Sequence, residues 1–323
     1  MAGLSKKAWT GYYAETTSGA STPQTVAPTV FAPAKGEMKF MRASAMLDED
    51  RGTRDENYGM IYGIRHADIS LKSDLYVESV PYPVMSAIGH STDTVVVAGA
   101  NKHLMIWDDF PRTLAVYQSY DTAEYFSNYA QTEKFDIKVT GEGKSVEFNA
   151  TVKGLYPIKK TTPDTPNFFS PVISSPEAGY YPKITLDGGS TSTDIMDFEF
   201  AFEQKLRLWT PVANSPDFIK IYPGSRKATV SFTARFDNDT YFNKWLAITN
   251  TSTGAMTFDV LGDLITGSTF NELSIAMPLM QFTDMELDKS KENVVVKVNA
   301  DLTSNSAGLF TLFFVNSLTS MTN

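Results

Sequence analysis

"ADISLKSDLYVESVPYPVMSAIG" runs from Ala67 to Gly89, and "ATVSFTARFDNDTYFNKWLAITN" runs from Ala228 to Asn250. Each stretch begins with small or apolar residues that alternate with polar ones, then turns, and closes with an amphipathic segment. The alternation predicts a strand with one buried face, because successive side chains of a strand point to opposite sides. The second stretch follows the first at an offset of 161 positions (228 − 67 = 161), about half of the 323 residues.

The two stretches predict the same local structures in the same order. A short helix is expected over 82–89 after the first strand and over 237–247 after the second. A shared order of strand, short helix and apolar strand at one offset indicates internal duplication. We therefore predict an all-β fold of two tandem, duplicated β-sandwich or barrel domains, each with a short flanking helix. The predicted buried faces consist of Ala67, Ile69, Leu71, Ser73 and Leu75 in the first strand and Ala228, Val230, Phe232, Ala234 and Phe236 in the second.

Composition and proline content set the predicted domain boundaries. Hydrophobic residues make up 42% of the chain and charged residues 20%, and the length allows two domains of ordinary size. Repeated proline removes hydrogen-bond donors from strands and interrupts helices, so the Pro-rich segment 162–182 is predicted to be a linker. It separates a first β domain, 37–161, from a second, 183–323. Residues 1–36, rich in Thr, Ala, Ser and Pro, are predicted to form an N-terminal arm.

The charge balance argues against a protein that grips nucleic acid. The net charge is −9, and no basic run is longer than Lys6-Lys7 or Lys159-Lys160, whereas phosphate binding needs a basic patch. The sequence has no cysteine, which excludes disulfides and thiolate sites. It also shows no signal-peptide pattern and no apolar run long enough to span a membrane, so we expect synthesis in a cytoplasm and no membrane insertion.

No motif in the sequence indicates catalysis. The three histidines, His66, His90 and His103, stand at the edges of predicted strands or helices and are expected to be surface residues. No nucleophile elbow, phosphate-binding loop or dinucleotide fingerprint is present. We therefore predict that the protein is not an enzyme and has no catalytic, cofactor-binding or metal-binding residue.

One charged loop, "LDEDRGTRDENYG" (47–59), has three interpretations. It is a solvated turn, or a calcium loop, or a surface that fixes the orientation of another subunit through complementary charge. Gly52 falls one position early for a calcium loop that begins at Asp48, so the solvated turn is favoured over calcium. For the third interpretation, the candidate contact residues are Asp48, Glu49, Asp50, Arg51, Arg54, Asp55 and Glu56.

Two tryptophans are further candidates for contacts between subunits. Trp209 precedes a proline-containing segment, Thr210–Lys227, which is expected to be a long loop. Its side chain is either an interface anchor or a core residue at the end of a strand, and both interpretations stay open. Trp9 belongs to the predicted arm, and aromatic residues in such arms dock onto neighbouring chains. Trp107 is expected in the core.

Larger segments resemble a known family. "PRTLAVYQSYDTAEYFSNYAQTEKFDIKVTGEGKSVEFNATVKGLYP" (111–157) and "IYPGSRKATVSFTARFDNDTYFNKWL" (221–246) are similar to stretches of the tail tube proteins, or major tail proteins, of long-tailed, non-contractile bacteriophages. "LSIAMPLMQF", "NVVVKVNADL" and "LFTLFFVNS" resemble the closing strands of that family. The likeness is to the two-domain form and covers the chain from about Met38 onward.

The resemblance implies a structural role. Rings of this protein would stack into a tube whose lumen conducts viral DNA during ejection, with the loops Asp48–Gly59 and Thr210–Lys227 reaching adjacent rings or subunits. The implied partners are further copies of the chain, a tape measure protein, and tail terminator and tail-tip proteins, with assembly in the host cytoplasm. Three copies of a duplicated chain supply six similar domains, which predicts a trimeric, pseudo-hexameric ring around an acidic lumen.

Two other classes of protein are consistent with the same pattern. A β-sandwich that binds or adheres at a virion or cell surface would use exposed aromatic platforms, for which Trp9, Trp107 and Trp209 are candidates. A tube protein of a contractile injection system shares the ring architecture, but duplication argues against it, since those chains usually have one domain.

Overall fold

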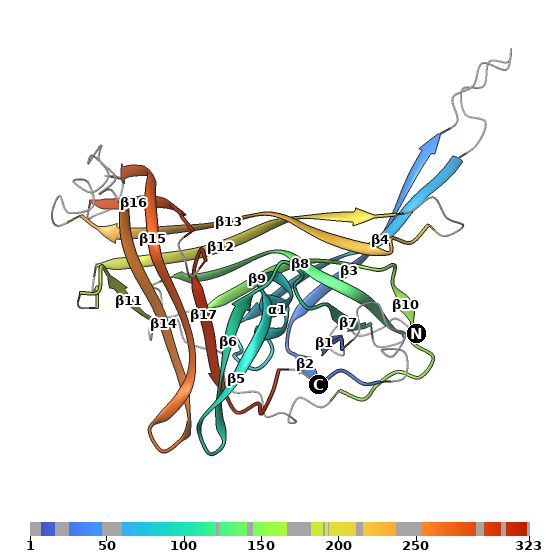
Figure 1. The fold of residues 1–323 in the computed structure, drawn as a ribbon, viewed down its shortest axis with the longest axis horizontal. Helices are drawn as coiled ribbons and strands as arrows, with labels where there is room; N and C mark the ends of the chain where they lie inside the picture. The colour runs from blue at the N-terminus through green and yellow to red at the C-terminus, as the bar shows by residue number, and fades with distance from the viewer. Residues whose placement is uncertain are drawn as a thin grey trace, which may run out of the picture.

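The structure is a computed structural model, and parts of the chain are described in it. The described residues are 8–16, 26–46, 60–120, 123–140, 145–166, 182–189, 191–192, 194–210, 216–236, 253–288, 294–304 and 308–321. These residues form an all-β fold with one helix, as predicted (Figure 1).

The first half contributes four antiparallel strands to one sheet. Their order is β3-β4-β9-β8, and the bounds are β3 Lys35–Met46, β4 Met60–Asp74, β9 Glu147–Gly154 and β8 Glu124–Thr140. The alternation in the first quoted stretch is confirmed in β4. Ala67, Ile69 and Leu71 are buried, while Lys72 on the opposite face is exposed.

The second half repeats this arrangement. Its order is β12-β13-β16-β15, and the bounds are β12 Ile195–Trp209, β13 Lys220–Arg235, β16 Val295–Leu302 and β15 Thr269–Asp288. Ala228, Val230, Phe232 and Ala234 of β13 are buried, as the second quoted stretch predicts.

A β-bulge occurs at the same place in both halves. In β8 the register shifts between Thr132 and Lys134, opposite Val152 and Thr151 of β9. In β15 it shifts between Phe282 and Asp284, opposite Ala300 and Asn299 of β16. Because a bulge changes the local twist and pairing, a matched bulge is a specific sign of duplication.

A second sheet packs against the first and also spans both halves. Its order is β5-β6-β17-β15-β14-β11. Only the first part of β15 belongs to this sheet. The bounds of the other strands are β5 Gly89–Val97, β6 Ala100–Trp107, β17 Thr311–Asn316, β14 Thr253–Thr266 and β11 Pro182–Leu186. In Figure 1 these strands run across the direction of β12 and β13.

The single described helix is α1, Pro81–Ile88, which confirms the prediction for the first half. All its residues are buried, and Pro81 occupies the first turn, where a missing N–H costs nothing. Gly89 follows because a Cβ there would collide with the carbonyl oxygen of Ile106. The helix predicted over 237–247 lies outside the described residues.

The segment predicted as an N-terminal arm contains two strands of the fold. β1 (Trp9–Ala14) pairs with β2 (Val30–Ala32) and with β7 (Leu114–Ser119). The first part of β8 continues this small sheet to β10 (Ile158–Lys159). The segment forms strands and not an arm because its aromatic and apolar side chains Tyr12, Ala14 and Val30 pack into the main core.

The described residues of both halves share one core. Phe135 of β8 and Phe202 of β12 have ring centroids 5.3 Å apart, and Phe202 also contacts Trp107 and Phe310, each at 5.9 Å. Aromatic pairs of this kind contribute about 0.5–1.5 kcal/mol each beyond their area burial. The contact between the halves is therefore part of the hydrophobic core.

The prediction of a long loop over Thr210–Lys227 is wrong for the second part of that segment, because β13 begins at Lys220. Pro223 lies within the strand, opposite Leu206 and next to a register shift. This part of β13 pairs only with β12 among the described strands, since β16 begins its pairing at Thr229. A proline is tolerated there because no ladder hydrogen bond is required on the open side.

Candidate assembly interface

The two halves meet edge to edge through β8 and β12. Residues 134–140 of β8 pair with residues 197–203 of β12 in one antiparallel ladder. On the core side Phe135 lies opposite Phe202, and on the other side Lys138 lies opposite Glu199, with an Nζ–Oε2 distance of 3.8 Å. Both charged side chains are over two-fifths exposed, so the aromatic contact contributes more of the stability.

The duplication identifies the strands that correspond to this joint. Phe40 of β3 pairs with Ala67, and Phe202 of β12 pairs with Ala228, the residue 161 positions after Ala67. Phe40 is therefore the counterpart of Phe202. In the same way Met285 of β15 is the counterpart of Phe135, because Met285 pairs with Val298 and Phe135 with Ala150.

The counterparts lie on open edges of the sheet. Among the described strand pairings, β3 pairs only with β4, and residues 282–287 of β15 pair only with β16. Phe202 is 1% exposed, whereas Phe40 is 44% exposed. An apolar residue at a position that is fully buried in the other repeat indicates a surface that another chain covers.

Two side chains cover part of the open edge of β3. Gln118 Nε2 donates to the carbonyl oxygen of Gly36, and the Met38 N–H donates to the hydroxyl oxygen of Tyr120 at 3.3 Å. The Tyr120 hydroxyl in turn donates to Gln118 Oε1 at 2.9 Å. Uncovered edges recruit strands indiscriminately, so these bonds limit the free stretch of β3 to the residues beyond Met38.

The predicted contact residues are placed as follows. Asp48, Glu49, Asp50, Arg51, Arg54, Asp55 and Glu56 lie outside the described residues, in the segment between β3 and β4. Trp9 is only 4% exposed, because its ring packs against Phe31 with a centroid distance of 4.9 Å. In this chain Trp9 is therefore a core residue, and its contact with a neighbouring chain stays a prediction.

Trp209 is exposed, at 43%, which removes the interpretation as a core residue. It ends β12 opposite Lys220, beside Ile219, which is 54% exposed. The Lys220 ammonium lies 5.3 Å from the ring centre of Phe110 and 4.9 Å from that of Tyr222. These side chains form an exposed aromatic patch, the kind of surface that protein interfaces use.

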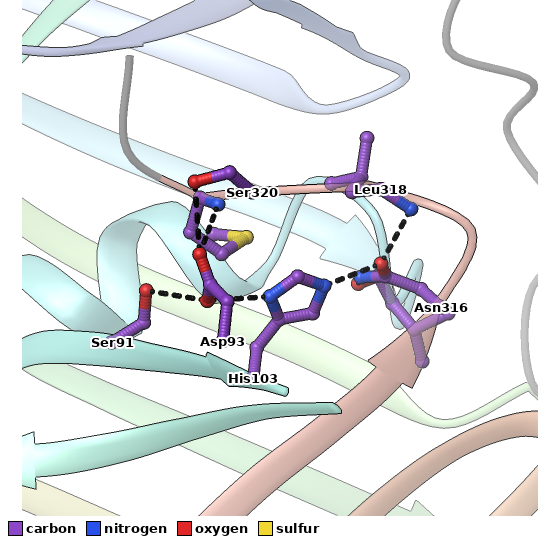
Figure 2. A network of polar contacts seen from close by, with 8 residues as sticks. Ser91, Asp93, His103, Asn316, Leu318 and Ser320 are labelled. Carbon is purple, nitrogen blue, oxygen red and sulfur yellow. Dashed lines mark hydrogen bonds and ion pairs between the residues drawn. The ribbon is translucent and has the colours of Figure 1, made fainter. Parts of the chain in front are cut away.

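The three histidines have different environments. His90 is exposed, as predicted, near Asp108 at 3.5 Å, and His66 is partly buried beside Asp68 at 3.3 Å. The surface prediction is wrong for His103, which is 0% exposed. Its Nδ1 lies 2.8 Å from Asp93 Oδ1 and its Nε2 lies 2.8 Å from Asn316 Oδ1, as Figure 2 shows.

The polar network around His103 holds the C-terminal segment against β5 and the residues after β4. Asn316 Nδ2 donates to the Val77 carbonyl at 2.6 Å, so the oxygen of the amide faces the imidazole. The two ring nitrogens therefore face oxygen atoms of Asp93 and Asn316. Burial raises the pKa of Asp93, but hydrogen bonds from His103, Ser320 and the Met321 N–H outweigh it and lower the pKa to about 2. The network joins β5 and β6 to the segment that follows β17, as Figure 2 shows.

Neither a metal site nor a membrane-spanning helix is found among the described residues. Within this part of the chain, no group of three or more His, Asp or Glu side chains is arranged to hold a metal ion. Among the same residues, no helix has the length and apolar character needed to cross a membrane.

A duplicated β subunit with open sheet edges and matching apolar positions defines a structural protein that builds assemblies from copies of itself. Comparison with protein families agrees with this class. The family model described as phage tail tube protein matches residues 8–302, nearly the whole chain, and the chain belongs to that family. It is a structural subunit of the tail of a bacteriophage virion. A search of curated proteins found no match.

Proposed function

We propose that three copies of this chain form a pseudo-hexameric ring, and that rings stack into a tube that conducts viral DNA during ejection. The observation that carries the proposal is the exposure of Phe40, the counterpart of the buried Phe202. In the ring, β15 of one copy pairs with β3 of the next, so that Met285 covers Phe40 as Phe135 covers Phe202.

The proposed joint is of the head-to-tail kind. An interface between two different edges of the same chain is head-to-tail and closes into a ring when the rotation permits. Each chain brings eight strands, in the order β3-β4-β9-β8-β12-β13-β16-β15, to one sheet. Three chains then supply a closed barrel of 24 strands (3 × 8 = 24), which removes every exposed edge.

The polar face of this sheet would line the lumen. In the second half that face carries the carboxylates of Asp197, Glu199, Glu203, Asp284, Glu286, Asp288 and Asp301, against fewer basic side chains, Lys227, Arg235 and Lys297. In the first half the two signs are nearly balanced, with Glu37, Asp68, Asp74, Asp136 and Glu147 against Lys35, Lys39, Lys72, Lys134, Lys138 and Lys153, so the acidic excess of the face comes from the second half. A lumen with an acidic excess repels DNA phosphates, so a DNA molecule moves through it without binding.

The membership of the tail tube family suggests which other proteins the chain assembles with. We infer that a tape measure protein sets the length of the tube, that terminator and tail-tip proteins close its ends, and that assembly takes place in the host cytoplasm.

Electron microscopy of the concentrated full-length protein tests the ring. We expect rings or tubes of uniform width, with three chains per ring in a reconstruction. Monomers at every concentration and salt would overturn the proposal, and six chains per ring would overturn its stoichiometry.

The aromatic patch around Trp209 favours a second candidate, a surface that binds glycans as an adhesion module. Exposed aromatic rings are suitable platforms for sugar rings, and Phe110 is 62% exposed. Binding to a glycan array that Trp209→Ala abolishes would support this function, and an array without signal would remove it.

A further inference from the structure

We infer that charge on the open edges selects the head-to-tail joint and rejects pairing of identical edges, with Lys39 and Glu286 as the central pair. This inference rests on the proposed ring. It concerns the polar face of the joint, opposite the face on which Phe40 and Met285 meet.

The joint within the chain supplies the template. Residue 136 of β8 lies opposite residue 201 of β12. Lys39 is the counterpart of Ala201, since Lys39 pairs with Asp68 and Ala201 with Thr229, which are 161 positions apart (229 − 68 = 161). Glu286 is the counterpart of Asp136, since Glu286 pairs with Lys297 and Asp136 with Asn149. The same pairing between two copies therefore places Lys39 opposite Glu286.

Each joint combines one acidic strand with one strand that carries lysines. Within the chain, Asp197, Glu199 and Glu203 of β12 meet Lys134 and Lys138 of β8. On the open edges, β15 carries Asp284, Glu286 and Asp288, and the free stretch of β3 carries Lys39 on the same face. Opposite charges on facing strands stabilise a pair, and like charges destabilise it.

The same register places Glu37, the third charged residue on the polar face of β3, opposite Asp288. Each of these two carboxylates has a lysine partner within its own chain, and that of Asp288 is Lys297 at 3.8 Å. The Glu37 carboxylate forms an ion pair with Lys39 at 3.8 Å. Glu37 also lies between Gly36 and Met38, whose edge groups are covered by Gln118 and Tyr120. In the stretch of β3 beyond Met38, the charged side chain on the polar face is therefore that of Lys39.

The pattern excludes the competing contacts. Two β15 edges would bring three carboxylates against three. Two β3 edges would bring lysines together. Such juxtapositions are repulsive devices that give an interface its specificity, and here they suppress two-fold dimers that cannot grow into a ring.

Charge reversal tests this inference. We expect K39E and E286K each to weaken the joint by about tenfold, the equivalent of about 1.4 kcal/mol, and the double variant K39E/E286K to restore ring formation. Ring content is measured by light scattering after size exclusion and by negative-stain microscopy, and circular dichroism verifies folding. The matched control is K72E on β4, an exposed lysine on the same face that pairs within the chain and should leave rings unchanged.

The outcomes separate this inference from the proposed function. Rings of wild-type protein that persist in K39E and E286K, or a double variant that does not recover, overturn the charge selection while the ring stands. Failure of the wild-type protein to form rings under any condition overturns the proposed function itself.

Discussion

Arg65 and Asp217 form a two-point ion pair across 152 positions of sequence. Arg65 Nε lies 2.6 Å from Asp217 Oδ1, and Nη2 lies 2.9 Å from Oδ2. The Arg65 N–H also donates to the Pro216 carbonyl at 3.1 Å, and its guanidinium lies 4.8 Å from the ring centre of Tyr156. The hydrogen bond to Asp217 raises the pKa of Arg65. The pair fastens the segment before β13 to β4 of the other half.

Removal of the Arg65–Asp217 ion pair should lower the stability of the fold only modestly. We expect Arg65→Ala to lower the free energy of unfolding by about 0.5–1 kcal/mol, because both side chains are about one-third exposed and solvent screens them. Thermal unfolding measures the change. Arg235→Ala is the control, since its ion pair with Asp194 is longer, at 3.4 Å, and more exposed. An equal or larger loss in the control would contradict the assignment.

The counterpart phenylalanines should separate folding from assembly. Phe202→Ala removes a buried ring and should cost about 3–5 kcal/mol of stability. Phe40 is 44% exposed and packs edge-on against Tyr125 and Tyr156 only on its other side. The effect of Phe40→Ala on unfolding should therefore be smaller, while the protein rings are lost. Chemical denaturation and negative-stain microscopy give the two readouts. Intact rings in Phe40→Ala would count against the joint between β3 and β15.

The Asp93–His103 pair should make stability depend on acid. The folded protein lowers the pKa of Asp93 from 3.8 to about 2, so the stabilisation is complete above about pH 4 and is lost as the pH falls through about 2. Its size is on the order of 2 kcal/mol. Asp93→Asn should lower the melting temperature at pH 7 and show less further loss between pH 4 and pH 2. A wild-type acid profile that Asp93→Asn reproduces unchanged would remove the ion pair from the explanation.

Charges in the segment between β3 and β4 are predicted to act between rings. Reversal of Asp50 and Asp55 to Lys should shorten tubes and leave isolated rings, with little change in unfolding, because solvated charges contribute little to core stability. Tube length is measured on micrographs and unfolding by calorimetry. A lower melting temperature with tubes of normal length would speak against a role in stacking.

The sequence predicted most of the fold where local pattern decides structure. The alternation in β4 and β13 placed their buried faces correctly, and Pro81 and Gly89 mark the ends of α1. Strand β1 was missed because its Thr- and Ser-rich surroundings resemble a loop, and its burial depends on pairing with β7, about a hundred residues later.

The candidate site was less accessible to sequence reasoning. His103 is buried by Asn316, which lies 213 positions away, so no local signal marks it. The counterpart of Phe40 depends on strand register and on the bulges, which the offset of 161 alone does not give. One available signal was the row of alternating acids in "TDMELD" (283–288), which a half-buried strand within a chain rarely requires.

Strand β15 takes part in both sheets along one unbroken backbone of 20 residues. Its first part is bonded on both sides, to β14 and β17, and its last part forms the acidic edge. A pull applied at that edge is carried as tension along covalent bonds into the middle of the second sheet, where the ladders to β14 and β17 resist it together. A mechanical load on one sheet is thus shared by the other.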